Sequence, residues 1–405
     1  MEIIIDATTT QDMAYSGTGQ YTHNLISALV SGFPKTQYRL FMYDTLSSTL
    51  EDSTLLKKNN VVVERVGECL PSFANTFTYL TRIAPKLNRI LSQGKKVVYF
   101  APYFQRGFPT LPIPSVVSVF DFAMPKFNYF SNKGRIMNFL RKREFWYRMH
   151  QTTKASAVIM ISESTRRDYM DSFPRFPQKK SIITPLGVDL EIRNSKDFEK
   201  YLPSDWKRKG YFIYLGGGLQ KNKNSEGVVE AYATFVKLAS KASKLEKVPY
   251  LVIAGKIFED LKSEQSRKLR ALIKKHKIHD KVIFTGFYSD KDKYPLLKNS
   301  IAFIHLSLCE AFGLAVAEAM RAKTPVIVHD GSSYPEVVGD SGILVDGLKP
   351  EAVANQMYKI FLDKKLRNDL ASKGYQRSLR FTWDTTARLT HGILKKVYND
   401  TYLVK

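Results

Sequence analysis

Short apolar runs rich in β-branched residues alternate with longer amphipathic stretches along this chain of 405 residues. The alternation is typical of strand–helix–strand units, which build a parallel sheet with helices on both faces. It occurs in two series. The first predicts strands at residues 2–6, 38–43, 60–65, 96–100, 115–120, 157–161 and 181–184, and the second predicts strands at residues 211–215, 249–254, 281–284, 301–306, 325–328 and 343–345.

The two series are separated by residues 186–210, a polar stretch that carries Gly and Pro without clear periodicity. Such a stretch predicts a change of domain and a hinge. We therefore expect an α/β protein with two open parallel-sheet domains, at residues 1–190 and 191–380. Sheets of this kind bind ligands outside the carboxyl ends of their strands, so two facing domains would enclose one cleft.

The charge balance and the cysteines narrow the function classes. A total of 62 Lys and Arg against 38 Asp and Glu leaves a net charge of +24, which predicts an anionic partner or, alternatively, a lysine-rich solvated surface.

Cys69 and Cys309 lie far apart and outside any CxxC or Cys/His cluster, so neither a disulfide framework nor a structural metal site is indicated. The chain begins without a secretory signal pattern and no stretch reaches the roughly 18 apolar residues of a membrane span. We expect a cytoplasmic chain that can lie on a membrane surface.

The segment IAFIHLSLCEAFGLAVAEAM, residues 301–320, predicts a buried strand, a turn and a helix. Glu310 falls on the turn and Glu318 in the second turn of the helix, which opens near Gly313. In this arrangement both carboxylates can face the ligand edge and accept hydrogen bonds from sugar or ribose hydroxyls. The alternative is one solvated glutamate on each side of the helix.

Two backbone features can hold an anion, and a third glycine loop precedes a helix. Residues 313–315 supply free N–H groups at the N-terminus of that helix, where phosphates bind. The loop GGGLQKNKN, residues 216–224, combines glycines with Lys221 and Lys223, although it lacks the endings of a Walker A loop or a GxGxxG motif. The loop YSGTGQY, residues 15–21, follows the first strand and opens an amphipathic helix. Simple glycine turns remain the alternative for both loops.

Metal and nucleophile motifs are weak in this sequence. The acidic pair Asp290 and Asp292 is better explained as an N-cap and first-turn acid than as a metal ligand. The 7 histidines form no HExxH or other metal spacing, and we expect His305 to be a satisfied core histidine.

The basic charge is concentrated in one amphipathic, aromatic-rich stretch, residues 126–154. Such a helix predicts a surface for anionic lipid head groups, whereas no sequence motif supports specific nucleic-acid binding. The alternative is an aromatic stripe that faces the core beneath a solvated basic face. The stretch has one acid, Glu144, the aromatic residues Phe139, Phe145, Trp146 and Tyr147, and the basic residues Lys126, Lys133, Arg135, Arg141, Lys142, Arg143, Arg148 and Lys154.

Taken together and in order, ten stretches over nearly the whole chain resemble the family 4 glycosyltransferases of the GT-B fold. They are SGTGQYTHNLISAL, VVSVFDFAMPKFNYF, AVIMISESTRRDYM, ITPLGVD, YLGGGLQKNKNSEGVVEAY, LVIAGK, VIFTGF, CEAFGLAVAEAM, TPVIVHDGSSYPEVVGDSGILVD and FTWDTTA. The resemblance implies an N-terminal acceptor-binding Rossmann-like domain at 1–190, a nucleotide-sugar-binding one at 191–380, and a C-terminal helix at 381–405 that packs back on the first domain.

The resemblance also implies roles for the matching residues. Glu310, Asp121 and Phe120 stand at the catalytic positions, where Glu310 would bind the hydroxyls of the donor sugar. The donor-binding positions are Gly17, Thr18, Gly19, Gly217, Lys221, Lys223, Lys256, Phe287, Phe312, Gly313, Leu314, Ala315 and Glu318. Among these, Glu318 would bind the ribose, and Lys223 would bind the pyrophosphate. The 312–315 amides would bind the sugar and the pyrophosphate, and Lys256 and Phe287 would form the nucleotide pocket. No metal or other cofactor is expected, because a lysine and a helix dipole can stabilise the diphosphate leaving group.

This sequence departs from the family pattern at three positions. Phe120 replaces the usual histidine before Asp121, which removes a side-chain donor to the sugar. Gln20 replaces the arginine that often follows the glycine loop, and Asn222 replaces the arginine before the pyrophosphate lysine, where Lys221 can compensate. We expect these three replacements to affect which donor is bound and how fast the sugar is transferred.

The implied activity is retaining transfer of a hexose, mannose or glucose being favoured, from a GDP- or UDP-hexose to a lipid-linked glycan or surface polysaccharide. The enzyme would work in the cytoplasm or on the inner face of the cell membrane, with an anionic membrane surface as a further partner. A transferase with a soluble acceptor, and a nucleotide-sugar or polyanion binder without turnover, are the alternatives.

Overall fold

The computed structural model of the chain describes residues 1–13, 16–44, 50, 54–68, 79–104, 113–120, 122–128, 134–193, 195–216, 221–242, 248–260 and 264–403. The chain divides into two units: Met1–Gly187 with Thr382–Lys405 form the first, and Val188–Phe381 form the second. The chain therefore crosses between the units twice. Both crossings lie close to the boundaries expected at residues 190 and 380.

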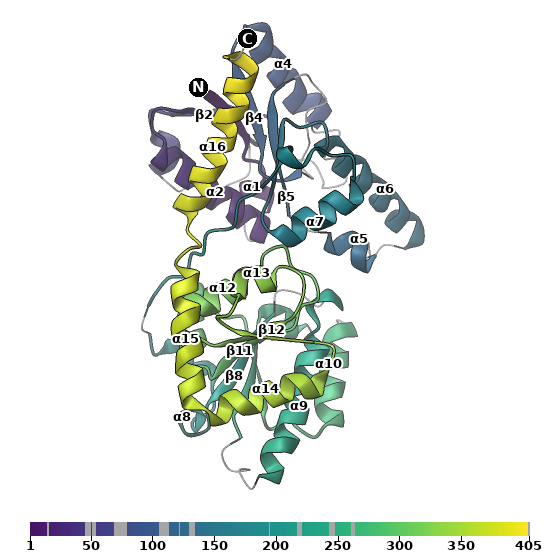
Figure 1. Cartoon of the computed structure of the whole chain (residues 1–405), viewed down its shortest axis with the longest axis vertical. Helices are drawn as coiled ribbons and strands as arrows, with labels where there is room; N and C mark the ends of the chain where they lie inside the picture. The colour runs from purple at the N-terminus through teal and green to yellow at the C-terminus, as the bar shows by residue number, and fades with distance from the viewer. Residues whose placement is uncertain are drawn as a thin grey trace. The chain divides into compact units, whose positions relative to one another are not determined.

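A seven-stranded parallel sheet forms the centre of the first unit, in the order β3-β2-β1-β4-β5-β6-β7. In this sheet β2 lies on one side of β1 and β4 lies on the other. The strand order therefore reverses between β1 and β4 (Figure 1). The strands are β1 (Glu2–Asp6), β2 (Gln37–Met42), β3 (Val61–Arg65), β4 (Val97–Ala101), β5 (Ser115–Val119), β6 (Ala157–Met160) and β7 (Ser181–Ile183).

Helices cover both faces of this sheet. On one face α2 and the last helix, α16, lie side by side (Figure 1), and Tyr402 of α16 donates a hydrogen bond to the Val97 carbonyl at 3.1 Å. The other face carries an apolar core with residues from α4, α6 and α7. The helices are α1 (Thr9–Asp12), α2 (Gly17–Gly32), η1 (Thr54–Lys57), η3 (Tyr79–Ile83), α4 (Ala84–Ser92), α5 (Ala123–Phe127), α6 (Arg135–Thr152), α7 (Glu163–Ser172), η5 (Gln178–Lys180) and α16 (Trp383–Tyr402).

The second unit repeats the architecture with a six-stranded parallel sheet in the order β10-β9-β8-β11-β12-β13. Here the order reverses between β8 and β11, which pair in parallel with Phe303 opposite Ile213. The strands are β8 (Tyr211–Leu215), β9 (Tyr250–Ala254), β10 (Val282–Gly286), β11 (Ala302–His305), β12 (Val326–His329) and β13 (Ile343–Val345).

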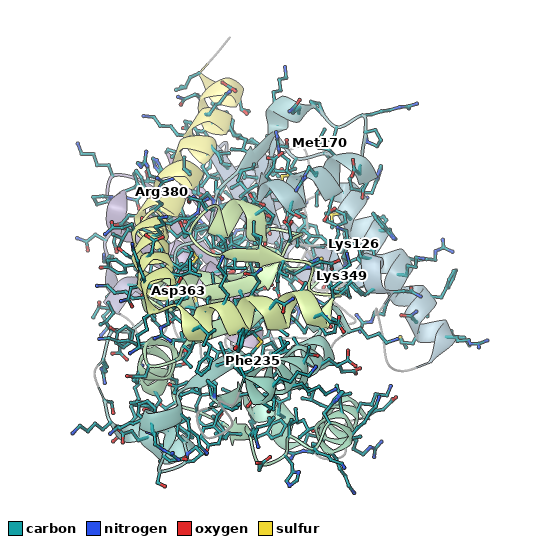
Figure 2. The ribbon with its side chains drawn as sticks, turned by 60° about the horizontal axis from the view of Figure 1, so that its bottom comes forward. Lys126, Met170, Phe235, Lys349, Asp363 and Arg380 are labelled. Atoms are coloured by element: carbon teal, nitrogen blue, oxygen red, sulfur yellow. The ribbon has the colours of Figure 1, made fainter. Side chains whose placement is uncertain are left out.

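Two apolar clusters bury the faces of this second sheet, because successive side chains of a strand point to opposite sides. Phe212 and Tyr214 of β8 pack with residues of α9 and α14, whereas Tyr211 and Ile213 pack with residues of α11 and α12. Figure 2 labels Phe235 of α9, whose ring meets Phe212 edge-on with 5.2 Å between centroids.

The second unit's helices lie around the sheet, and some begin at a capping side chain. Asp363 (Figure 2) separates α14 from α15, and its carboxylate accepts a hydrogen bond from the Leu366 amide at 2.8 Å. The helices are η6 (Asp197–Tyr201), α8 (Trp206–Lys209), η7 (Lys221–Lys223), α9 (Ser225–Lys241), η9 (Lys256–Glu259), α10 (Glu264–Lys275), α11 (Asp290–Lys298), α12 (Leu314–Arg321), α13 (Tyr334–Val338), α14 (Pro350–Leu362) and α15 (Lys364–Ser378).

The predicted α/β class with two parallel-sheet, Rossmann-like domains is confirmed, and each predicted strand coincides with a strand within one or two residues. The predicted linker at 186–210 is wrong in its extent. The chain passes between units at Gly187 and Val188, and the following residues fold onto the second unit, where Phe198 is buried against Trp206. Over the described residues, no helix combines the length and apolarity needed to cross a bilayer.

Candidate functional site

Lys223 and Glu310 meet where the strand order of the second sheet reverses. Lys223 ends η7 after β8, and Glu310 lies between β11 and α12. Chains leaving two neighbouring parallel strands in opposite directions open a crevice at their carboxyl ends, which is where such sheets bind ligands. The Lys223 ammonium Nζ is 2.6 Å from Oε1 of Glu310, and both side chains are about four-fifths buried. The two residues predicted separately to bind the donor are therefore direct partners.

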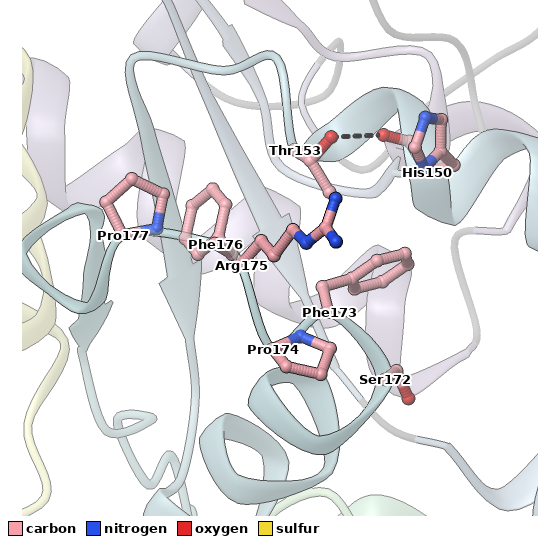
Figure 3. Close-up of a pocket in the computed structure, with 8 residues that line it drawn as sticks. All are labelled: His150, Thr153, Ser172, Phe173, Pro174, Arg175, Phe176 and Pro177. Atoms are coloured by element: carbon pink, nitrogen blue, oxygen red, sulfur yellow. Dashed lines mark hydrogen bonds between the residues drawn. The ribbon is translucent and has the colours of Figure 1, made fainter.

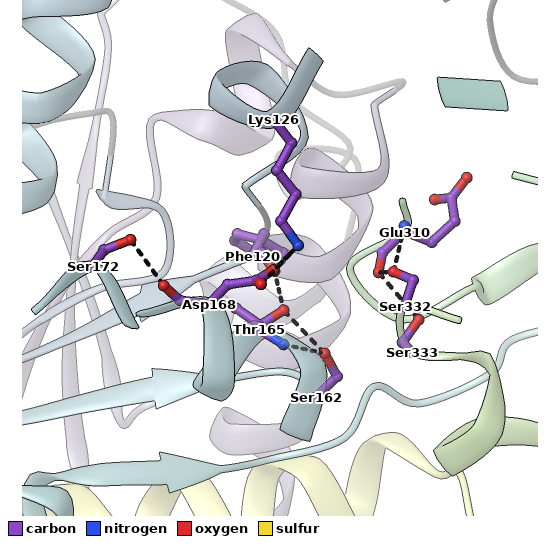
Figure 4. A network of polar contacts seen from close by, with 9 residues as sticks. All are labelled: Phe120, Lys126, Ser162, Thr165, Asp168, Ser172, Glu310, Ser332 and Ser333. Carbon is purple, nitrogen blue, oxygen red and sulfur yellow. Dashed lines mark hydrogen bonds and ion pairs between the residues drawn. The ribbon is translucent and has the colours of Figure 1, made fainter. Parts of the chain in front are cut away.

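Two serines fix the backbone of Glu310 (Figure 4). Its amide donates to the Ser332 hydroxyl at 2.9 Å, and the hydroxyls of Ser332 and Ser333 donate to its carbonyl at 2.8 and 3.1 Å. Ser332 adopts a left-handed φ of 54°, a conformation uncommon outside glycine. These three hydrogen bonds hold the turn that presents the Glu310 carboxylate.

Glu310 is ionised although it is buried. Burial alone would raise the pKa of its carboxyl, but the charges and hydrogen bonds of Lys223 and His305 outweigh burial and lower the pKa to about 2. A carboxylate at this position accepts hydrogen bonds and does not donate them. Glu310 can therefore bind hydroxyl groups at neutral pH, and its second oxygen, Oε2, accepts none from the described residues.

His305, the last residue of β11, is the second neighbour of the carboxylate. Its Nε2 is 3.5 Å from Glu310 Oε1, and its ring stacks between Phe303 and Tyr214 with centroid distances of 5.4 and 5.9 Å. Within the described part of the chain, no group hydrogen-bonds to its buried Nδ1. His305 is therefore a core histidine, as expected, but only one of its two ring nitrogens has a partner among the described residues.

Asn222 joins the two loops. Its side-chain amide donates to the Cys309 carbonyl at 3.1 Å, and its own carbonyl accepts from the Leu308 amide at 2.6 Å and the Ser307 hydroxyl at 3.0 Å. This residue stands where the family pattern has an arginine. Here it connects the loop after β8 to the loop after β11, which sets the distance between Lys223 and Glu310.

Helix α12 begins beside Glu310. Gly313 precedes its first residue with φ of 88°, and a Cβ at this position would come within 2.8 Å of the Tyr334 ring. The amides of Gly313, Leu314 and Ala315 donate to no acceptor among the described residues, as expected for the first turn of a helix. Phe312 is buried and meets Phe381 edge-on at 5.2 Å, so it anchors this turn.

Glu318 points to a different partner from Glu310. It is 7% exposed, and Oε1 lies 3.1 Å from Nζ of Lys293 in α11. Burial raises the pKa of the Glu318 carboxyl, and the charge of Lys293 opposes this rise. Burial likewise raises the pKa of the nearby Tyr288 hydroxyl to about 12. The alternative of a solvated Glu318 is excluded.

The other donor-binding candidates of the second unit follow neighbouring strands. Lys221 lies after β8, Lys256 after β9 and Phe287 after β10, and all three side chains are exposed. Because the strands are parallel, these residues share the carboxyl edge of the sheet with Glu310. Gly217 lies outside the described residues.

In the first unit, Gly17, Thr18 and Gly19 do not form a loop. They are the first turn of α2, whose N-cap is the Ser16 hydroxyl, which accepts from the Gly19 amide at 3.1 Å. The expected glycine loop is therefore wrong in its conformation, because a serine cap lets the helix begin at Gly17.

Phe120 lies at the carboxyl edge of the first sheet, directly after β5. Its ring meets Tyr21 edge-on at 4.9 Å, and its carbonyl accepts a hydrogen bond from the Thr165 hydroxyl of α7 (Figure 4). One lone pair of that carbonyl is thus already used within the unit. Asp121 lies outside the described residues.

The second unit resembles a known protein family in sequence. Residues 199–377, which include all of the residues around Glu310, match the family model of glycosyl transferases group 1. The second unit is a group 1 glycosyl transferase domain.

Curated relatives of this chain are distant, and the alignments cover only part of each. It is 25% identical over 262 residues to the serotype-specific mannosyltransferase WbdA of Escherichia coli, which covers 64% of this chain and 31% of that protein. It is 28% identical over 232 residues to a Campylobacter jejuni diphospho-undecaprenol 4-alpha-N-acetylgalactosaminyltransferase, covering 56% of this chain and 57% of the relative. The chain thus spans less than two thirds of either relative.

Solved structures show the same GT-B fold. The sucrose-phosphate synthase of Thermosynechococcus elongatus superposes with a TM-score of 0.72 at 16% identity, covering 99% of this chain and 100% of that one. HepE of Anabaena, solved with UDP-glucose, superposes with a TM-score of 0.67 at 16% identity, covering 98% and 100%. At these identities the likeness extends to the fold of the transferase.

A separate hollow lies on the first unit (Figure 3). It measures about 450 Å³ and opens at the amino ends of β6 and β7, at the edge of the sheet opposite Phe120. It is lined by His150, Thr153, Ser172, Phe173, Pro174, Arg175, Phe176 and Pro177. Among the described residues, no three His, Cys, Asp or Glu side chains are grouped to hold a metal ion.

Sequence reasoning missed the role of four residues that build the candidate site. These are His305, Ser332, Ser333 and Lys293. For Lys293 the sequence held one signal, because it follows the two first-turn acids Asp290 and Asp292 of α11 directly. The serines carry no pattern, since they act only after β12 has brought them beside Glu310.

Proposed function

We propose that this chain transfers a hexose from a nucleotide sugar to an acceptor hydroxyl. The observation that carries the proposal is the Lys223–Glu310 pair, 2.6 Å apart at the reversal point of the second sheet and next to the N-terminus of α12. The carboxylate can accept hydrogen bonds from the sugar hydroxyls of a nucleoside diphosphate sugar. The ammonium and the unused amides of α12 can bind its diphosphate.

The donor would lie across the carboxyl edge of the second unit. Glu310 would accept hydrogen bonds from sugar hydroxyls, while Lys223 and the α12 amides would bind the diphosphate. Glu318, held by Lys293, would bind the ribose, and the exposed Lys256 and Phe287 would flank the base.

The reaction that we propose retains the anomeric configuration. The bond between the anomeric carbon and the phosphate oxygen breaks, a bond to the acceptor oxygen forms on the same face, and the acceptor proton passes to the departing phosphate. Negative charge grows on that phosphate, and Lys223 together with the α12 dipole would stabilise it without a metal ion.

Mannose or glucose, carried by GDP or UDP, is the proposed donor, and a lipid-linked glycan is the proposed acceptor. Two names support this: WbdA is a mannosyltransferase, and the Campylobacter relative is named for a diphospho-undecaprenol substrate. HepE was solved with UDP-glucose. The first unit would bind the acceptor, on the cytoplasmic face of a membrane.

A second candidate is a nucleotide-sugar binder without turnover. Phe120 favours it, because an apolar ring packed on Tyr21 stands at the family's histidine position and Thr165 occupies its carbonyl. Phe120→His separates the two: a higher transfer rate indicates an enzyme limited by the missing imidazole, and an unchanged zero rate favours the binder. A transferase with a soluble acceptor is distinguished by transfer to small sugars or sugar phosphates.

The first experiment is a thermal-shift series with UDP, GDP, ADP and their hexose conjugates, since a ligand at 100 times its Kd adds about 2.7 kcal/mol of stability. The preferred donor then enters a transfer assay with lipid-linked acceptors, with and without EDTA. Glu310→Gln should abolish transfer, whereas Lys237→Met, an exposed lysine of α9, should not change it. Absence of any nucleotide shift would contradict the proposal.

A further inference from the structure

Helix α6 presents a stripe of exposed apolar side chains. Ile136, Phe139, Leu140 and Tyr147 are 80, 57, 51 and 53% exposed. Their spacing places them on one side of the helix, because residues three, four and eleven positions apart share a helical face. The opposite side holds Phe145 and is buried in the first unit's core. We call these four residues the α6 stripe.

Most exposed large side chains on proteins occur singly and need no explanation, whereas a contiguous set marks an interaction surface. The α6 stripe groups four such side chains on one face over three turns of one helix, with Arg143 between Leu140 and Tyr147. Both alternatives stated for this stretch therefore hold in part: Phe145 faces the core, whereas Phe139 and Tyr147 face outward.

Unpaired cations accompany the stripe. Arg143 lies within it, with its guanidinium 5.8 Å from the Phe139 ring, and Lys142 flanks it. Arg141 and Arg148 are paired with Glu144 at 3.3 and 2.7 Å. Across the described ranges, no carboxylate lies within ion-pair distance of Lys142 or Arg143, so both charges remain available.

A hollow of about 380 Å³ lies between these charges and the aromatic rings. It is lined by Phe139, Lys142, Arg143 and Trp146. Two cations at the rim of an aromatic hollow are complementary to a phosphate that is attached to an apolar body.

We infer that the α6 stripe docks on an anionic phospholipid bilayer. The four apolar side chains would enter the boundary between head groups and acyl chains, while Lys142 and Arg143 bind lipid phosphates in and beside the hollow. A second copy of this chain does not fit, because two such basic faces would repel each other. Nucleic acid offers the phosphates but no partner for Ile136 and Leu140. The inference extends the proposed function, whose acceptor is lipid-linked.

The test is flotation with vesicles of phosphatidylcholine, with and without phosphatidylglycerol. One variant removes the apolar side chains (Ile136→Ser, Phe139→Ser, Leu140→Ser), and a second reverses the charges (Lys142→Glu, Arg143→Glu). The matched controls are Leu348→Ser with Leu362→Ser and Leu379→Ser, and Lys364→Glu with Lys365→Glu, all exposed residues of the second unit.

Wild type and both controls should float with anionic vesicles, and each α6 variant should lose about tenfold in binding, because insertion and charge act together. Binding by the serine variant that equals wild type would overturn insertion, and binding by both α6 variants that equals wild type would overturn the docking surface. Binding to RNA but not to vesicles would also overturn it.

A nucleotide thermal shift measured on the same variants separates this inference from the proposed function. If the α6 variants lose vesicle binding but keep the nucleotide thermal shift, the defect lies in the α6 stripe. Loss of the shift in every protein, with flotation intact, would reject the transferase proposal and leave the docking surface standing.

Discussion

Lys223 and His305 approach the same oxygen of Glu310: Nζ of Lys223 lies 2.6 Å and Nε2 of His305 3.5 Å from Oε1. One residue comes from the loop after β8 and the other from the end of β11. Their convergence on one oxygen keeps the carboxylate ionised.

Removing one member of the Lys223–Glu310 pair should cost more stability than removing both. Lys223→Met or Glu310→Gln leaves a largely buried charge without its partner, at about 3 kcal/mol, whereas the double variant leaves neither charge. Urea unfolding of the four proteins measures this. All three variants should lose transfer by orders of magnitude, and additive stability losses would contradict the pairing.

Acid should weaken the folded state through Glu310. Its pKa is lowered from 4.5 to about 2 on folding, so the stabilisation is complete above the unfolded value and is lost as the pH falls through the folded value. The shift corresponds to up to about 3 kcal/mol. Free energies of unfolding measured between these two pH values should fall less steeply in Glu310→Gln. Parallel curves for the two proteins would refute this role of the carboxylate.

His305→Phe should separate stability from activity. The phenyl ring keeps the stacking with Phe303 and Tyr214 and removes a buried nitrogen without a partner, so the melting temperature should stay the same or rise. The pKa of Glu310 should rise, because one stabilising group is lost. We expect transfer to fall about tenfold with its acid limb shifted to higher pH. An unchanged pH profile would show that His305 only fills space.

Gly313→Ala should destabilise the second unit by about 1–3 kcal/mol, because alanine at φ of 88° is strained and its Cβ would press on the Tyr334 ring. Gly392→Ala is the matched control. Gly392 lies exposed in the interior of α16 with open space around it, so alanine should stabilise there by about 0.5–1 kcal/mol. Thermal melts of both variants give the comparison, and a neutral Gly313→Ala would contradict the close approach.

The strands of both sheets were predictable because each is a short, fully apolar run between amphipathic helices. The extent of the linker was not, since Phe198 and Trp206 pack on the second unit within an otherwise polar stretch. The start of α2 was missed because the Ser16 cap outweighs the two glycines that weaken its first turn.

Glu310 and Lys223 were predictable as residues but not as a pair. Their contact depends on the reversal of strand order between β8 and β11, which a single sequence does not encode locally. The same holds for Ser332 and His305. Their positions next to Glu310 follow from the register of β11 and β12, whose partners lie far apart along the chain.

The two crossings of the chain also fix an order of assembly during synthesis. The amide of Val188 and the carbonyl of Phe381, the first and last residues of the second unit, are hydrogen-bonded at 3.1 Å, so this unit is an insertion with adjoining ends. A ribosome releases residues in sequence, and domains fold as they emerge. The first unit begins to emerge first but receives α16 last, after the whole of the insertion has been translated. Until then α16 does not cover its face of the sheet, and the Val97 carbonyl lacks the hydrogen bond from Tyr402.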